Sequence, residues 1–173
     1  VLQAILEDMY TKSFSSILQE VILEPFNMRN SSFEPVNHII RDSLIALPYD
    51  SELYNYNSQD PISNPPPIYH GLASGGLWTS PLELANFLLN FQKVLTGATI
   101  GGLTPQMAHH MLSPHISLHQ GLGFRINSNC VLQEKTNGKY FGHSGHSSGY
   151  LSLLAGSKDG KHGIVIMINF LFK

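Results

Sequence analysis

The chain of 173 residues contains a single cysteine, Cys130, and few charged residues. One cysteine excludes an internal disulfide, and Cys130 has no basic neighbour or helix end that would make it a reactive thiolate. No apolar stretch approaches the about 20 residues that a membrane-spanning helix needs, and no segment has the pattern of a signal peptide. Charged residues make up 13% of the chain and the net charge is −2, so there is no basic surface for nucleic acid or an anionic membrane.

What is present indicates one globular domain. Hydrophobic residues make up 42% of the chain, and its length allows a sizeable core. The spacing of apolar residues predicts helices first and an antiparallel sheet afterwards, which is an α+β fold. The helical part is predicted over residues 1–112 and the sheet over 121–169, with a long irregular loop over 33–78.

Two helix starts carry clear signals. Ser13 is a good N-cap for a helix that extends to Pro25. Ser80-Pro81-Leu82-Glu83 combines an N-cap, a proline at the first position and a glutamate at the third, which predicts a capping box. The expected buried positions of these helices, and of a shorter one from Thr104, are Phe14, Ile17, Leu18, Val21, Ile22, Leu84, Phe87, Leu88, Phe91, Val94, Leu95, Met107, Ala108, Met111 and Leu112.

The stretch 140–169 is predicted to be the centre of the sheet. Asp159-Gly160 is a strong hairpin signal, and the β-branched run Ile164–Ile168 predicts a buried strand after it. Shorter strands are predicted over 121–126 and 130–132, with Asn137-Gly138 as a turn. His143-Ser144-Gly145 is predicted at the start of a core strand, where a hydroxyl and an imidazole beside glycine could meet a substrate. The same tripeptide also occurs by chance as ordinary turn composition.

Four segments in order resemble one known family. They are ILEPFNMRNSSF over 22–33, ASGGLWTSPLELA over 73–85, GLGF over 121–124 and GHSGHSSGY over 142–150. These are similar to P-L-G-M-x-x-T, A-G-G-L-x-S-T-x-x-D-L-A, G-L-G-W and G-H-T-G-x-x-x-G-Y/F of the serine β-lactamase and penicillin-binding-protein superfamily. The match is to its class C β-lactamase and D-alanyl-D-alanine carboxypeptidase branch. In the first segment, phenylalanine and asparagine replace the usual leucine and glycine.

The resemblance implies roles for the fourth segment. His143 would hold a proton or a hydrogen bond near the substrate, Ser144 would orient the substrate, and Gly145 would leave room for it along the strand edge. The backbone N–H of His146 would be one of two oxyanion-hole donors. The remaining residues implied at the substrate site are Gly149 and Tyr150.

Two motifs of that family are missing from these 173 residues. No serine is followed by lysine three positions later, and no tyrosine is followed by asparagine two positions later. The family places both motifs before the point that corresponds to Val1. We therefore expect a C-terminal portion of a serine hydrolase that lacks its nucleophile and is inactive alone. Its parent would act on an amide, an ester or a β-lactam, with a carboxypeptidase or esterase favoured by the histidine of the fourth segment.

Several alternatives stay open at this stage. A non-catalytic relative could bind a peptide or a protein in the same cleft, or the resemblance could mislead and the chain could be an independent α+β domain. The expected partners are an acyl substrate, the missing N-terminal part and a second copy of the chain; no cofactor or metal is expected. Family resemblance would imply the bacterial periplasm or secretion. The residues with ordinary structural interpretations are His109, His110, His115 and His119 (surface), Trp78 (core) and Tyr54, Tyr56 and Tyr69 (packed loop).

Overall fold

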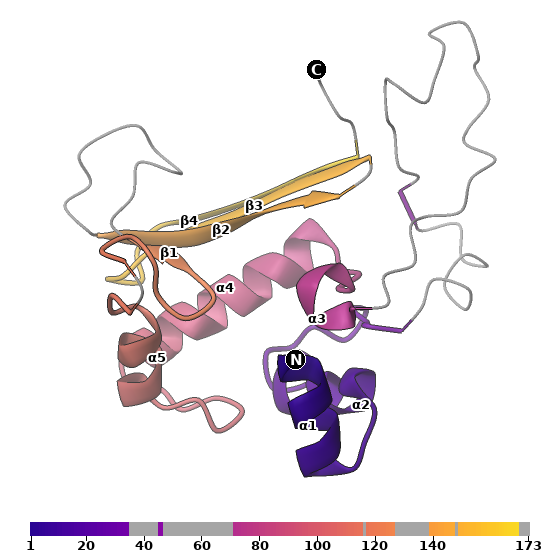
Figure 1. Cartoon of the computed structure of the whole chain (residues 1–173). Helices are drawn as coiled ribbons and strands as arrows, with labels where there is room; N and C mark the ends of the chain where they lie inside the picture. Colours follow the sequence, from indigo (N-terminus) through magenta and orange to yellow (C-terminus); the bar gives the residue numbers. More distant parts are fainter. Residues whose placement is uncertain (35–44, 47–70, 116, 127–138, 148, 170–173) are drawn as a thin grey trace, which may run out of the picture.

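The computed structural model describes residues 1–34, 45–46, 71–115, 117–126, 139–147 and 149–169. In these residues the helices come first and an antiparallel sheet follows, which confirms the predicted α+β class (Figure 1). The elements are α1 (Leu2–Tyr10), α2 (Phe14–Leu18), the π-helix η1 (Gln19–Leu23), α3 (Leu72–Gly75), α4 (Pro81–Leu95), α5 (Pro105–Met111), β1 (Arg125–Ile126), β2 (Tyr140–Ser147), β3 (Tyr150–Ser157) and β4 (Gly163–Ile168).

The sheet is a simple antiparallel meander. Its strands lie side by side in the order β1-β2-β3-β4, so each strand pairs with its neighbour in sequence. The predicted hairpin is present: β3 and β4 flank the turn that contains Asp159-Gly160, and Gly160 has a φ of 74°. Only glycine adopts this left-handed conformation at little steric cost, which explains its place in the turn. The hairpin is part of a three-stranded unit, because β2 adds a third long strand on the other side of β3.

One face of the sheet packs against α4, and glycines allow the close approach. A Cβ atom on Gly156 would lie 2.7 Å from Leu88 Cδ1, and one on Gly163 would lie 2.8 Å from Leu88 Cδ2. In Figure 1 the helices lie on this side of the sheet, which we call the helix-facing side. The opposite side is the outer face.

The core forms between α4 and the helix-facing side. The ring of Phe91 lies 4.9 Å from that of Phe124 and 5.3 Å from that of Phe141, centroid to centroid. Val94 is fully buried beside them. The predicted stripe of α4 is therefore confirmed, with Leu84 and Phe87 packed at the core margin. Removing a buried aromatic side chain from such a cluster costs about 3–5 kcal/mol.

The predicted N-caps form with the expected geometry. The side chains of Ser13, Ser80 and Thr104 accept hydrogen bonds from the third residue of their helices. The capping box at Ser80 is only half formed, however. Its serine accepts from Glu83 N at 3.3 Å, but the glutamate side chain bonds elsewhere. The sequence pattern could not show that distant partner.

Three helix and strand predictions need correction. The helix after Ser13 changes to a π-helix at Gln19, which leaves Val21 exposed instead of buried. Met107 is also exposed, because α5 presents Ala108 to the core instead. The predicted strand over 121–126 begins only at Arg125, since the four residues before it form a turn closed by a hydrogen bond from Gly121 N to Phe124 O.

The outer face is apolar and exposed along β4 in the described part of the chain. The prediction of β4 as a strand is confirmed, but the prediction that it is buried is wrong for this structure. Ile164, Ile166 and Ile168 expose 49%, 39% and 39% of their surface. No labelled helix lies on this face in Figure 1. The helix α1 likewise contains no buried residue, and its Leu2 is 76% exposed.

The residues predicted as a loop, 35–44 and 47–70, lie outside the described part, as do the predicted strand 130–132 and the turn Asn137-Gly138. The tyrosines predicted to pack in this loop, Tyr54, Tyr56 and Tyr69, also lie outside the described residues. Among the helices that the structure describes, none has the length and apolar character to cross a membrane.

Candidate active site

The residues of the fourth segment come together at the junction of two strands. His143, Ser144, Gly145 and His146 all lie on β2, and Tyr150 opens β3. Gly149 lies in the connection between them with a φ of 77°, a conformation that favours glycine. The tripeptide predicted at the start of a strand is thus in the middle of one. The side chains of His143, Ser144 and His146 are exposed.

The strand geometry assigns each side chain to a face. Phe141 of β2 pairs with Gly156 of β3, and both contact α4 or its core, so both mark the helix-facing side. Because successive side chains alternate, His143 and Gly145 share the side of Phe141. Ser144 and His146 belong to the outer face.

The backbone of β2 is open on one edge beside these residues. Lys158 N donates to Lys139 O at 2.8 Å, which makes these two residues a hydrogen-bonded pair of the β2–β3 ladder. In an antiparallel pair such positions alternate, so the odd-numbered residues of β2 bond β3 and the even-numbered ones point away. Ser144 and His146 therefore direct their N–H and C=O groups to the other edge.

The strand on that other edge is short. β1 pairs only with Phe141 and Gly142. From residue 143 onward, no strand of the described chain pairs with the edge of β2. An extended acyl substrate could add to this edge by backbone hydrogen bonds, and His146 N–H faces the space where an acyl oxygen would lie.

Gly145 has a steric role at this place. A Cβ atom on Gly145 would lie 2.4 Å from Ser152 Oγ, the side chain of its partner on β3. A larger residue would thus displace the Ser152 hydroxyl on the helix-facing side. Glycine keeps this part of the sheet surface low.

An aromatic pair stands at the end of the same side. Tyr150 pairs with Ser147, and its ring lies edge-to-face with Trp78 at 6.0 Å between centroids. Its hydroxyl donates to Ala46 O at 2.8 Å. The sequence predicted Trp78 as core, but it is only half-buried, and nothing in the local pattern indicated its contact with Tyr150.

A buried carboxylate joins the first two family segments. Glu83 is 6% exposed and accepts hydrogen bonds from Asn30 N at 2.8 Å, Asn30 Nδ2 at 3.0 Å and Ser31 Oγ at 2.5 Å. We call this arrangement the carboxylate clasp. Next to it, Ser32 and Trp78 exchange two backbone hydrogen bonds of 2.8 and 2.9 Å. The clasp thus fixes the backbone that presents Trp78.

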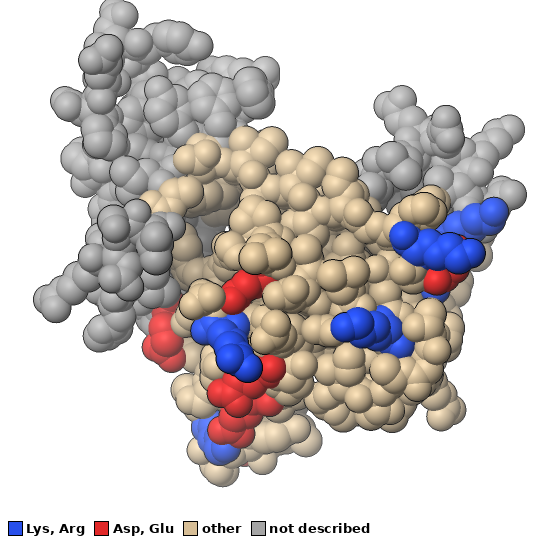
Figure 2. Space-filling model, turned by 180° about the vertical axis from the view of Figure 1, so that it is seen from behind, with Lys and Arg blue, Asp and Glu red and all other residues tan. Residues whose placement is uncertain are grey.

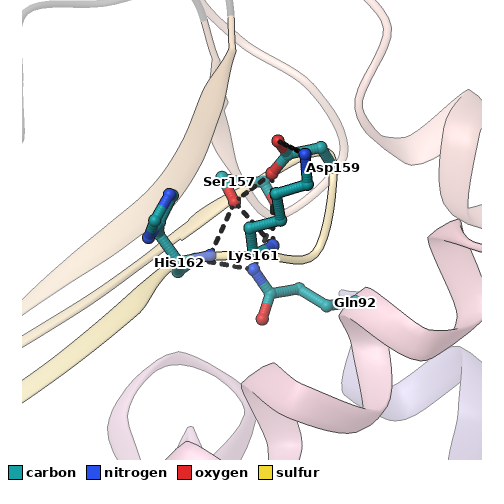
Figure 3. A network of polar contacts seen from close by, with 5 residues as sticks. All are labelled: Gln92, Ser157, Asp159, Lys161 and His162. Carbon is teal, nitrogen blue, oxygen red and sulfur yellow. Dashed lines mark hydrogen bonds and ion pairs between the residues drawn. The ribbon is translucent and has the colours of Figure 1, made fainter.

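A second polar network closes the β3–β4 hairpin onto α4 (Figure 3). Gln92 Nε2 donates to the carbonyl oxygens of Ser157 at 2.9 Å and His162 at 2.8 Å. Ser157 Oγ donates to Asp159 Oδ1 at 2.6 Å, and this bond is the main reason that the pKa of Asp159 lies below its ordinary value. Burial lowers the pKa of Lys158 nearby. This network lies at the far end of β3 from Tyr150 and holds the sheet in place.

Metal ligands do not gather in the described residues. No group of three histidine, cysteine, aspartate or glutamate side chains forms there. The rings of His110 and His115 stack edge-to-face at 4.6 Å, and His115 Nε2 lies 2.9 Å from His110 O. Charged groups are sparse, and on the face in Figure 2 most basic side chains lie beside acidic ones, while one basic group near the centre stands alone. That face shows no basic patch.

The family model for beta-lactamase matches residues 1–173, which is the whole chain. The chain belongs to the beta-lactamase family. This membership confirms the resemblance carried by the four segments and excludes an independent, unrelated α+β domain. None of the curated proteins matches the chain.

Solved structures agree with the family fold. An octameric penicillin-binding protein homologue from Pyrococcus abyssi superposes with a TM-score of 0.73 at 24% identity, over 98% of this chain and 36% of that one. A D-stereospecific amidohydrolase from Streptomyces sp. gives a TM-score of 0.66 at 16% identity, over 97% of this chain and 47% of that one. The chain therefore spans less than half the length of these two structures.

Proposed function

We propose that this chain forms one wall of the active site of a serine acyl hydrolase. The observation that carries the proposal is the open edge of β2, where Ser144 and His146 direct backbone groups away from β3. His143 and Gly145 lie on the helix-facing side of the same strand. Family membership supports an acyl substrate, and the strand edge offers it hydrogen bonds in an extended conformation.

The reaction is nucleophilic acyl transfer. A serine oxygen attacks the carbonyl carbon of an amide, an ester or a β-lactam, and the leaving amine or alcohol takes a proton as its bond to carbon breaks. Water then adds to the acyl carbon and releases the serine with its proton restored. His146 N–H would stabilise the negative oxygen in both steps, and His143 would hold a hydrogen bond near the substrate. The histidine form of this motif favours a carboxypeptidase or an esterase.

The nucleophile must come from residues outside this sequence. The 173 residues contain neither S-x-x-K nor Y-x-N. We propose that the gene product carries them in a further segment, and that the 173 residues alone do not hydrolyse acyl substrates. The exposed apolar surfaces of α1 and β4 support this, because surfaces of that kind are normally covered.

Serine labelling tests the proposal. The full gene product and the 173-residue chain would each be treated with a fluorophosphonate and a fluorescent penicillin, and intact masses would be measured. We expect one adduct on the full product and none on the chain. Labelling of the chain itself would show that the nucleophile lies within it.

A non-catalytic binding protein is the second candidate, favoured by the absence of both motifs from the sequence and by the open strand edge. It predicts that neither form is labelled, while both bind an acyl-D-alanine peptide.

Size-exclusion chromatography at several concentrations tests whether the exposed apolar surfaces are covered in the full gene product. We expect the chain alone to associate with itself, whereas a compact monomer at all concentrations would contradict the proposed missing segment.

Gly145→Ala probes the site residues directly. The new methyl group would occupy the space 2.4 Å from Ser152 Oγ, so we expect kcat/KM of the full product to fall at least tenfold. The double variant with Ser152→Ala removes that clash, because the next atom, Ser152 Cβ, lies at 3.8 Å. Activity that stays low in the double variant indicates that substrate needs the space. Full recovery would show that Gly145 serves packing only, and would refute its role at the site.

A further inference from the structure

Trp78 and Tyr150 form an aromatic surface at the end of β3, one strand away from the open edge of β2, which we call the aromatic wall. Both side chains are half-buried, so each combines a packed part with an accessible part. Their edge-to-face contact at 6.0 Å is within the range that stabilises aromatic pairs. Tyrosine and tryptophan lose little conformational entropy on binding, because each has only two side-chain torsions.

The wall is fixed from both sides. The backbone N–H and C=O of Trp78 bond Ser32 at 2.8 and 2.9 Å, next to the carboxylate clasp. Tyr150 belongs to β3, and its hydroxyl donates to Ala46 O at 2.8 Å. The Trp78 backbone and the Tyr150 ring are therefore held in place before any ligand arrives, and the Trp78 ring packs against Tyr150, which lowers the cost of binding.

The register places the wall within reach of the candidate site. Tyr150 lies opposite Ser147, and Gly145 is two residues back along the same strand. At about 3.4 Å per residue, this separation is about 7 Å along the strand. By strand alternation, all three positions lie on the helix-facing side of the sheet. A substrate paired to the open edge lies two strand spacings, about 10 Å, from β3, so its substituent reaches the ring of Tyr150 by crossing β2 over the low surface at Gly145.

We propose that the aromatic wall binds an apolar or aromatic substituent of the acyl substrate and so determines acyl specificity. The inference rests on the proposed function, because it takes the open edge of β2 as the place of the acyl group. It adds a residue, Trp78, that lies outside the fourth family segment. Substrates with a benzyl-like acyl substituent should be preferred over those with a methyl group.

A pair of matched ligands tests this on the full gene product. Phenylacetyl-D-alanine and acetyl-D-alanine share the amide and carboxylate and differ in one ring. We expect calorimetry to show about tenfold tighter binding of the phenylacetyl compound, which corresponds to about 1.4 kcal/mol. Trp78→Ala should remove this preference and Trp78→Phe should restore most of it. Met107→Ala, which changes an exposed apolar residue on α5, is the control that should retain it.

Two further readouts separate a binding role from a structural one. Circular dichroism of Trp78→Ala checks that the fold is kept, and tryptophan emission, compared with that of Trp78→Phe, should shift with the phenylacetyl ligand alone. Equal affinity of the wild type for both ligands would refute the proposed role of the aromatic wall in acyl specificity, while leaving the proposed function intact. Absence of binding by both ligands would also overturn it, and serine labelling would then decide whether the proposed function falls as well.

Discussion

Replacing Glu83 by glutamine tests whether the carboxylate clasp joins the loop after η1 to α4. The carboxylate is 6% exposed and accepts three hydrogen bonds from Asn30 and Ser31. Glutamine has nearly the same size, so the substitution creates no cavity and changes only the charge and one acceptor. The Ser31 hydroxyl, which also lies 2.6 Å from Thr79 Oγ1, would have to turn to accept from the new amide.

The expected loss follows from the bonds. Hydrogen bonds to a charged group contribute about 1.5–3 kcal/mol and neutral ones about 0.5–1.5 kcal/mol. Three bonds that each weaken by about 1 kcal/mol set an upper limit of about 3 kcal/mol. Burying an amide costs less than burying a charge, which offsets part of that loss. We therefore expect Glu83→Gln to lower the free energy of unfolding by about 1–3 kcal/mol, a large part of the about 5–15 kcal/mol typical of a domain.

Urea unfolding, followed by circular dichroism and by Trp78 fluorescence, measures this change. Trp78 is the only tryptophan of the chain and lies beside the clasp. Glu20→Gln is the matched control, since Glu20 contacts Lys12 at 2.7 and 2.8 Å but is 55% exposed. An exposed pair of this kind contributes at most about 1 kcal/mol. Equal effects of the two substitutions would refute the clasp, as would a coupling near zero between Glu83→Gln and Ser31→Ala.

Three further predictions concern the sheet. Gln92→Leu removes two buried hydrogen bonds to hairpin carbonyls and should lower the free energy of unfolding by about 2–3 kcal/mol in a urea titration. Its control is Gln106→Leu at an exposed position of α5, which should change the free energy of unfolding by less than about 0.5 kcal/mol. The bond from Ser157 lowers the pKa of Asp159 in the folded state. Asp159 therefore stabilises the fold above its unfolded pKa, and the stability difference between wild type and Asp159→Asn should vanish as the pH falls through the folded pKa; a constant difference down to acid pH would contradict this. Gly156→Ala should cost about 1–3 kcal/mol by overpacking against Leu88, and thermal unfolding without a change in midpoint would show that α4 can move away.

Local signals in the sequence predicted the local structure well. Ser80 and Thr104 begin helices because their hydroxyls satisfy backbone N–H groups only three residues away. Asp159-Gly160 predicted the β3–β4 hairpin because the turn itself requires a left-handed residue. In each case the cause lies within a few residues of the signal, so the chain's own pattern contains it.

Predictions that depend on distant partners were less successful. Glu83 has the sequence position of a capping-box residue, yet its partners Asn30 and Ser31 come from more than 50 residues earlier. The β-branched residues of β4 indicate a strand, but their burial depends on what covers the outer face. The turn at Gly121 reads as a strand because its alternating apolar residues fit both, and Gly123 adopts a φ of 76° that no strand has.

The candidate site shows the same division. The positions of His143 and Gly145 on one strand were predictable from the fourth segment, since adjacent residues of a strand stay together. The open edge of β2 was not, because it depends on β1 beginning only at Arg125, opposite Gly142. Trp78 could not be found either, since its contact with Tyr150 joins residues more than 70 positions apart.

Contacts link the four family segments to β2 and β3, which explains why the family can be recognised in a chain that lacks S-x-x-K. Ser32 of the first segment bonds Trp78 of the second, and Trp78 contacts Tyr150 of the fourth. Phe124 of the third packs at 5.3 Å against Phe141, just before the fourth segment on β2. These contacts fix the position of the strand and its open edge. The segments shared with the family therefore position β2 and its open edge, and under the proposed function a serine from outside these residues would attack a substrate held at an edge that is already ordered.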